Sequence, residues 1–333
     1  MSEDILPIPC IPSGLREASQ RGILIPFIGA GVSRIAGCPG WPEFADGALR
    51  CLVEEGNFSH KQLAQIGHLN PRVKLSIALA LEKEHGTRIN FRKLLHQSGK
   101  KDNAKGQKLF GHLGKLGKTF ATTNYDEWLD EEIGMPAVAV DTKYDPAASA
   151  IVNQRKIVHK VHDLTPANLN QPNTVIHLHG SVLDPDGMVL TTQHYARHYA
   201  NDRLSGNAEK ENRVLIFLEH LFQQKTVLFV GYGLEELEIL EYVILKARRP
   251  AGTGHNEAKH YLLQGFYSHE HELMRSLTRY YLEECGIQLI PFLRDHKDWD
   301  QILDVLEEFA RAAPASNPLY VQEFKEMGDL LDD

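Results

Sequence analysis

Three short stretches, each at the end of an apolar run, contain the residue types that could bind and cleave a phosphorylated ligand. Phe27–Ser33 is a glycine turn, Thr122–Asp126 supplies an amide and a carboxylate, and Ile176–Gly180 places a histidine before a glycine. A glycine turn lets a diphosphate approach the backbone, and a histidine can serve as a general base near neutral pH. Together they indicate a chain that binds a dinucleotide and breaks it without a hydride transfer.

Glycine turns occur at two places. Gly29–Gly31 follows an apolar run and leads into an expected helix whose free N–H groups could receive a diphosphate. Arg34 stands where the third glycine of the dinucleotide fingerprint would be, so the pattern is partial. Ser33 is either a phosphate ligand or the N-cap of the helix. Val230–Gly233 ends a later apolar run, and for both turns a tight connection without a ligand is an equally good interpretation.

The polar residues of the other two stretches have distinct candidate roles. Asn124 can orient a water or a ribose hydroxyl, and Asp126 can accept from a carboxamide, although either could instead cap a following helix. His177 and His179 are two residues apart on an expected strand, so we expect them to face the same side. Only His179 leaves the sheet before a glycine, which makes it the candidate base, although most of the 17 histidines should be solvated or structural.

The remaining apolar runs alternate with longer amphipathic stretches, which is typical of an α/β fold with a largely parallel sheet. Strands are expected at Ile23–Ile28, Lys118–Thr122, Ala137–Val140, Val175–Leu178, Val227–Val230, Tyr261–Leu263 and Ile287–Phe292. Such sheets bind ligands where the carboxyl ends of their strands open onto loops, and the candidate residues fall at such ends.

The expected organisation has three parts: an N-terminal extension at residues 1–22, a ligand-binding catalytic domain at 23–312, and a helical tail at 313–333. Within the domain, residues at about 41–113 show helical spacing and no strand pattern, so we expect a helical insertion that packs over the first glycine turn. The other expected segments are an irregular stretch or flap at Lys143–Asn173, a polar loop at Asn201–Asn212, and tail helices at Trp299–Ala312 and Pro318–Leu331.

Composition excludes several classes of partner. The chain has 333 residues, 42% of them apolar, and a net charge of −8. That charge argues against direct nucleic-acid binding and against an anionic membrane surface. No apolar run approaches the ~18 residues of a transmembrane helix, and the N-terminus lacks a signal-peptide pattern, so a cytoplasmic protein is expected. The four cysteines are not paired as CxxC and the HxH pair has no evident third ligand, so we expect no metal.

In their order along the chain, these motifs resemble the sirtuin-like family. The resemblance is carried by GAGVS at Gly29–Ser33 with Gly37 and Pro39 downstream, TTNYD at Thr122–Asp126, LHG at Leu178–Gly180, VLTTQHY at Val189–Tyr195, and VGYG at Val230–Gly233. It spans roughly Ile23 to Ile290, and VLTTQHY is similar to the bacterial, defence-associated branch.

The resemblance implies a Rossmann-like fold that binds NAD as its substrate and cleaves the nicotinamide–ribose bond. The cofactor-binding set it implies is Gly29, Ala30, Gly31, Ser33, Thr123, Gly231, Tyr232 and Gly233. The first four would meet the diphosphate, and the last three would lie by the adenosine half. In the catalytic set, Asn124 would hold the ribose or the attacking water, Asp126 would contact the carboxamide, and His179 would act on a ribose hydroxyl or water.

Differences from the deacylating sirtuins favour the branch of the family that hydrolyses NAD. This chain lacks their four-cysteine zinc ribbon, has Thr123 in place of their glutamine, and reads Gly40–Phe44 where they have an acidic-aromatic-arginine run. The resemblance therefore implies an NAD glycohydrolase of antiphage defence, a homo-oligomer with a HerA-like ATPase as partner. The alternatives are a module that senses NAD or ADP-ribose without turnover and, third, a protein deacylase. The presence of both Asn124 and His179 favours the hydrolase.

Overall fold

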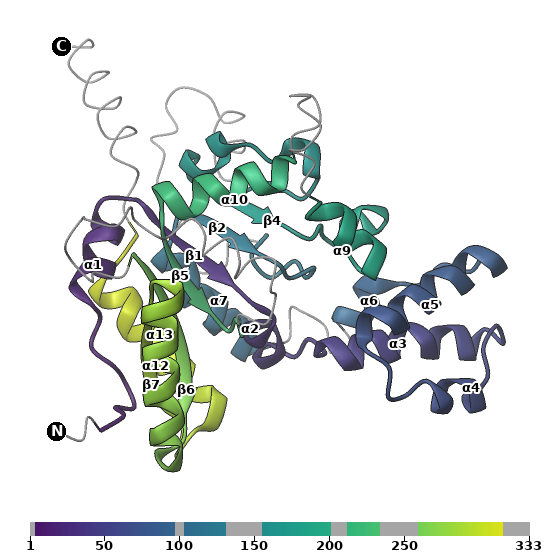
Figure 1. Ribbon diagram of the computed structural model, residues 1–333, viewed down its shortest axis with the longest axis horizontal. Coiled ribbons are helices and arrows are strands. Elements are labelled where there is room, and N and C mark those ends of the chain that lie inside the picture. Colours follow the sequence, from purple (N-terminus) through teal and green to yellow (C-terminus); the bar gives the residue numbers. More distant parts are fainter. Residues whose placement is uncertain (1–3, 97–102, 131–154, 201–211, 234–258, 316–333) are drawn as a thin grey trace, which may run out of the picture.

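A parallel sheet of seven strands forms the centre of the computed structural model, which describes residues 4–96, 103–130, 155–200, 212–233 and 259–315 (Figure 1). Its strands are β1 Leu24–Ile28, β2 Thr119–Thr122, β3 Lys156–Val158, β4 Thr174–His177, β5 Thr226–Val230, β6 His260–Phe266 and β7 Ile287–Leu293. The order is β3-β4-β2-β1-β5-β6-β7, and every adjacent pair is parallel. The predicted α/β, Rossmann-like fold is confirmed.

The first strand lies in the middle of the sheet. β1 pairs with β2 on one side, where Ile28 is opposite Thr122, and with β5 on the other, where Ile28 is opposite Val230. From β1 the chain moves outward through β2 towards β4 and β3, and it then returns to the opposite side of β1 with β5. In open α/β sheets, ligands bind at the carboxyl ends of the strands beside such a reversal of strand order.

Both faces of the sheet are covered, because side chains along each strand alternate between two apolar clusters. Ile25 and Phe27 of β1 pack in one cluster, and Leu24 and Ile28 in the other. Helices α10 Arg213–Gln224 and α12 His271–Cys285 contribute to the first cluster. Helices α1 Ser13–Gln20, α2 Ala30–Ile35, α7 Ala104–Leu116 and α13 Gln301–Ala312 contribute to the second.

The helical insertion has a core of its own and extends away from the sheet in Figure 1. It contains α3 Trp41–Glu54, α4 His60–Gln65, α5 Pro71–His85 and α6 Phe91–Leu95. Helix α5 shows how the sequence sets these boundaries. The Asn70 side chain accepts from the Arg72 amide at its start, and Gly86 ends it with a left-handed φ of 69°. Helix α7, by contrast, belongs to the cluster on the sheet.

The expected packing of the insertion over the first glycine turn stays a prediction, because the contacts of its core lie elsewhere. Its core instead includes Tyr125, from the loop after β2, and Val182, Met188 and Leu190, from the segment after β4. Trp41 stacks on Tyr125 with ring centroids 5.7 Å apart. Spacing alone identifies the helices, whereas the surface they cover depends on loops that lie far away in the sequence.

A second correction concerns Lys143–Asn173, which we expected to be irregular. Its described part contains β3, which pairs with β4 at the edge of the sheet. This strand has only three residues, too few to show a pattern. The expected strand Ala137–Val140, the tail helix Pro318–Leu331 and nearly all of the loop Asn201–Asn212 lie outside the described residues. Among the described helices, none is long and apolar enough to cross a membrane.

Candidate functional site

The candidate residues follow four strands that are neighbours in the sheet, in the order β4, β2, β1, β5. Gly29 comes after β1, Thr123 after β2, Leu178 after β4 and Gly231 after β5. Because the strands are parallel, all four ends open at the same edge, beside the reversal of strand order at β1. The fold therefore gathers motifs that lie far apart in the sequence.

The two glycine turns pack directly against each other. The amide of Gly29 donates to the Val230 carbonyl at 2.9 Å, and that of Gly31 donates to the Gly231 carbonyl at 2.8 Å. A Cβ on Gly31 would lie 2.8 Å from the Gly231 oxygen, and Gly231 has a φ of 61°. These glycines are thus required by the packing of the chain itself, and the Gly31 N–H group is already bonded. Ala30 is exposed between them.

The residues of the second glycine turn, Val230–Gly233, differ in their surroundings. The Tyr232 ring belongs to the core on one face of the sheet, with its centroid 5.3 Å from that of Phe27 and 5.6 Å from that of Phe229. Gly233 is exposed and ends this described segment. The Tyr232 ring therefore has a packing role, which leaves Gly231 and Gly233 as the ligand candidates of this turn.

Ser33, Asn124 and Asp126 form one buried hydrogen-bonded group. The Ser33 Oγ lies 2.6 Å from Asp126 Oδ2 and 2.9 Å from Asn124 Nδ2. Helix α2 begins at Ala30 with Gly29 as its N-cap, so the prediction of Ser33 as an N-cap is wrong. Asp126 Oδ1 accepts from the Trp128 amide at 3.1 Å. The serine hydroxyl therefore joins α2 to the loop after β2.

The chemistry of this group fixes the orientation of the Asn124 amide. An ionised carboxylate only accepts, so Ser33 donates its single hydroxyl proton to Asp126. The serine oxygen must then accept from Asn124 Nδ2. Asn124 Oδ1 consequently points away from Ser33, and it is buried without a hydrogen-bond partner among the described residues. A buried, unsatisfied acceptor is costly, which suits a group that bonds to a ligand.

The Thr122 hydroxyl connects this loop to the sheet. The Thr122 Oγ1 donates to the Ile28 carbonyl at 2.7 Å and accepts from the Asn124 amide at 3.0 Å. The end of β1 and the backbone of Asn124 are therefore linked through one hydroxyl, a role that the sequence did not indicate. Thr123, the predicted ligand next to it, is buried.

His177 forms an ion pair that sequence reasoning missed. Its Nδ1 lies 2.9 Å from the Asn124 carbonyl oxygen, and its Nε2 lies 2.8 Å from Asp130 Oδ1. Burial lowers the pKa of His177, but the charge and hydrogen bond of Asp130, with the Asn124 carbonyl and Asp126, outweigh it and raise the pKa above the usual value. No spacing rule pairs Asp130 with a strand that follows it by more than forty residues.

His179 has a different set of partners. Because β4 ends at His177, strand alternation does not extend to His179, so the expectation of a shared side has no basis. The Nε2 of His179 lies 2.6 Å from the Tyr199 hydroxyl, and its Nδ1 lies 3.4 Å from the Tyr195 hydroxyl. Tyr195 belongs to α9 Thr192–His198, and the guanidinium of Arg72 from α5 lies 3.6 Å above its ring.

These partners enclose His179 and keep it neutral. The residue is 1% exposed, and burial lowers its pKa well below the usual range, with His198 and Arg72 lowering it further. A neutral imidazole is the form that accepts a proton, but a pKa this far below neutral makes the ring a weak base in the enclosed arrangement. Both ring nitrogens, however, already face tyrosine hydroxyls, so a substrate must displace the Tyr199 contact before His179 can act.

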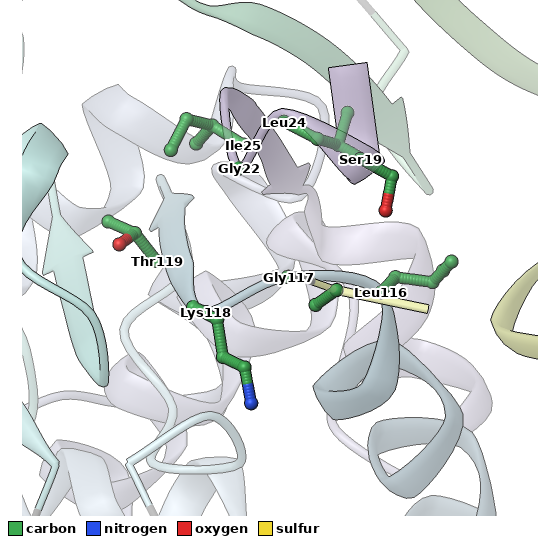
Figure 2. A pocket seen from close by; sticks show the side chains of 9 residues that line it. Ser19, Gly22, Leu24, Ile25, Leu116, Gly117, Lys118 and Thr119 are labelled. Carbon is green, nitrogen blue, oxygen red and sulfur yellow. The ribbon is translucent and has the colours of Figure 1, made fainter. Parts of the chain in front are cut away.

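Two further observations bear on ligands. Among the residues that the structure describes, no three His, Cys, Asp or Glu side chains gather as they would to hold a metal. Figure 2 shows a small hollow at the amino ends of β1 and β2, lined by residues that include Ser19, Leu24 and Lys118. It lies at the opposite end of these strands from Gly29 and Asn124, so it is not part of the candidate site.

Comparison with known protein families gives a match over about half of the chain. A family model described as a SIR2-like domain matches residues 118–290. The matched region contains Asn124, Asp126, His179 and the turn at Gly231, whereas Gly29–Ser33 lies before it. Among curated proteins, none matches the chain.

Proposed function

Because this chain belongs to the family of SIR2-like domain proteins, whose members are NAD-dependent enzymes, we propose that it hydrolyses NAD to nicotinamide and ADP-ribose. The observation that carries the proposal is the Asn124 amide, whose Oδ1 is buried and unpartnered at the strand ends where such folds bind dinucleotides. Ser33 and Asp126 hold that amide in one orientation.

The proposed reaction needs few groups. The bond between the ribose C1′ and the nicotinamide nitrogen breaks with its electron pair going to nicotinamide, which leaves positive charge on the ribose. A water attacks C1′ and loses one proton, giving ADP-ribose. Asn124 Oδ1 accepts from the water or a ribose hydroxyl, and His179 takes the proton once Tyr199 has moved aside. Help from a general base is worth ~10²–10⁴-fold.

One observation favours a second candidate, a module that binds NAD or ADP-ribose without turnover. His179 is buried beneath Tyr195 and Tyr199, with both ring nitrogens facing hydroxyl groups. A sensor has no need of an accessible base. A protein deacylase has less support, because the four cysteines form no disulfide and are spread between exposed and buried positions.

Release of nicotinamide from NAD by the purified chain, followed by chromatography, separates these candidates. We expect release that falls close to background in His179→Ala and in Asn124→Ala, with circular dichroism showing that both variants keep the fold. Tight ADP-ribose binding with no release, even at high enzyme concentration, would favour the sensor. Full release by a folded His179→Ala variant would contradict the assigned base.

We further propose that the protein acts in antiphage defence as a homo-oligomer that works with a HerA-like ATPase. The support is the resemblance of the motifs to that branch of sirtuin-like proteins. Pro318–Leu331, an apolar segment outside the described residues, is the proposed contact. Mass in solution should rise when such an ATPase is co-expressed, and deletion of residues 318–333 should remove the rise. A fully active monomer at low concentration would contradict the assembly.

A further inference from the structure

The His177 ring connects β4 to the loop that carries Asn124. One ring nitrogen faces the Asn124 carbonyl oxygen at 2.9 Å and the other faces Asp130 Oδ1 at 2.8 Å. The His177 side chain is fully buried and that of Asp130 is 9% exposed. Neither the family's catalytic roles nor the proposed reaction uses either residue, so this ion pair still needs an explanation.

Both partners of the ring are acceptors. A backbone carbonyl and an ionised carboxylate have no proton to give, so each ring nitrogen must carry its own. Only the imidazolium form satisfies both contacts, and a neutral ring would leave a lone pair facing an oxygen. The titratable groups around the ring are Asp130, Asp126 and His159, and the two carboxylates favour the charged form.

The contact with the carbonyl completes the restraint of Asn124. The Asn124 amide nitrogen donates to Thr122 Oγ1 at 3.0 Å, its side chain donates to Ser33 Oγ at 2.9 Å, and its carbonyl accepts from His177. The three restraints come from β2, α2 and β4. Without the third, the peptide group after Asn124 can rotate and take the side chain with it.

We propose that His177 is a positioning residue for Asn124, held in place by its ion pair with Asp130. This inference rests on the proposed function, because it assigns to Asn124 the contact with the ribose or the water. His177 itself touches no substrate. Its Nδ1–H group sets where Asn124 Oδ1 points, and a displacement of about 1 Å at such a group can cost ~10²-fold in rate.

A matched pair of variants separates positioning from simple packing. In asparagine the amide nitrogen lies close to the place of the histidine Nδ1, and in glutamine it lies close to that of Nε2. Asp130→Asn is included in both, so that no carboxylate is left buried without a cation. His177→Asn with Asp130→Asn keeps a donor for the Asn124 carbonyl. His177→Gln with Asp130→Asn lacks that donor.

We expect the asparagine variant to release nicotinamide at least ~10-fold faster than the glutamine variant, because Asn124 is misplaced in the glutamine variant. The difference should lie in kcat, and melting temperatures of the two should agree. His112→Gln, which changes another buried histidine on α7, is the control and should leave the rate unchanged. Equal rates in the two double variants would overturn the positioning role and leave only a structural ion pair.

Measurement of ADP-ribose binding distinguishes a failure of the proposed function from a failure of this inference. If the wild-type chain binds ADP-ribose but releases no nicotinamide, the hydrolase proposal fails. The same two variants are then compared by ADP-ribose affinity, where the glutamine variant should bind more weakly because Asn124 still meets the ribose. Equal affinities, or no binding of ADP-ribose by the wild type, would contradict the inference.

Discussion

The hydroxyl of Ser33 lies 2.6 Å from a carboxylate oxygen of Asp126, a residue 93 positions later in the chain. Ser33 is 4% exposed, and the same hydroxyl receives the side-chain amide of Asn124. A serine at this place in a glycine turn invites assignment as a phosphate ligand. Its oxygen is instead hydrogen-bonded to the two polar residues of the next motif, so the first motif orients Asn124 and Asp126.

Ser33→Ala should therefore damage turnover more than binding. The change leaves Asp126 Oδ2 and Asn124 Nδ2 buried without a partner, at a cost of about 1–3 kcal/mol in the free energy of unfolding. The Asn124 side chain can then rotate, so kcat for nicotinamide release should fall at least ~10-fold. Ser276→Ala, which removes a hydroxyl from the exposed face of α12, serves as the matched control. An unchanged kcat would show that Asn124 needs no help from Ser33.

The glycine turns allow stability and ligand binding to be separated at adjacent positions. Gly31→Ala should lower the free energy of unfolding by about 1–3 kcal/mol, because the new Cβ meets the backbone of Gly231. A loss of NAD binding in that variant would therefore say little about the diphosphate. Ala30 is exposed, so Ala30→Asp should leave the fold intact.

If the diphosphate lies against this turn, Ala30→Asp should weaken ADP-ribose binding several-fold through repulsion between like charges. Ala30→Asn has nearly the same shape without the charge and should bind normally. Calorimetric titration of both variants at low salt measures the difference. Equal affinities would place the diphosphate elsewhere.

Removal of the Tyr199 hydroxyl tests whether this group keeps substrate away from His179. In Tyr199→Phe, Nε2 of His179 loses its 2.6 Å partner, so the enclosed arrangement should lose about 1 kcal/mol. Displacement of the ring by substrate then becomes easier, and nicotinamide release should rise ~5-fold, while the melting temperature falls by only a few degrees. A fall to the level of His179→Ala would instead mean that Tyr199 takes part in the chemistry.

Stability should fall as the pH is lowered, and His260 on β6 should contribute to the fall. Burial, followed by the charge of Lys259, lowers the pKa of His260 to about 3. In the unfolded chain this histidine binds a proton below pH ~6.5, whereas in the folded chain it does not, so acid favours unfolding. Between pH 8 and pH 5 this amounts to about 2 kcal/mol. Urea unfolding should show a correspondingly smaller loss for His260→Asn, and an identical loss in both proteins would contradict the shift.

Much of the fold could be predicted because turn residues mark the ends of its apolar strands. Runs such as Val227–Val230 are apolar throughout, as strands covered on both faces must be, and a glycine follows directly. β3 was not predicted because it has only three residues and forms by pairing with β4. Local pattern thus identifies strands that are long enough, and tertiary pairing determines the others.

The candidate site residues stand out in the sequence, but the contacts that they make in the structure do not. Asn124, Asp126 and His179 stand out because they follow apolar runs. The Asp130 partner of His177 has no such signal, since an acidic residue in a loop is ordinarily solvated. The enclosure of His179 by Tyr199 likewise depends on how α9 returns to the sheet, which no periodicity expresses.

The central position of β1 has a consequence for how the protein is made. The ribosome completes this strand first, yet its two neighbours are β2, which ends at Thr122, and β5, which ends at Val230. A growing chain therefore holds one side of β1 open until residue 230 has emerged, and contacts so distant in sequence form slowly. For the same reason, a fragment cut to residues 118–290 would be missing the strand that joins its two halves.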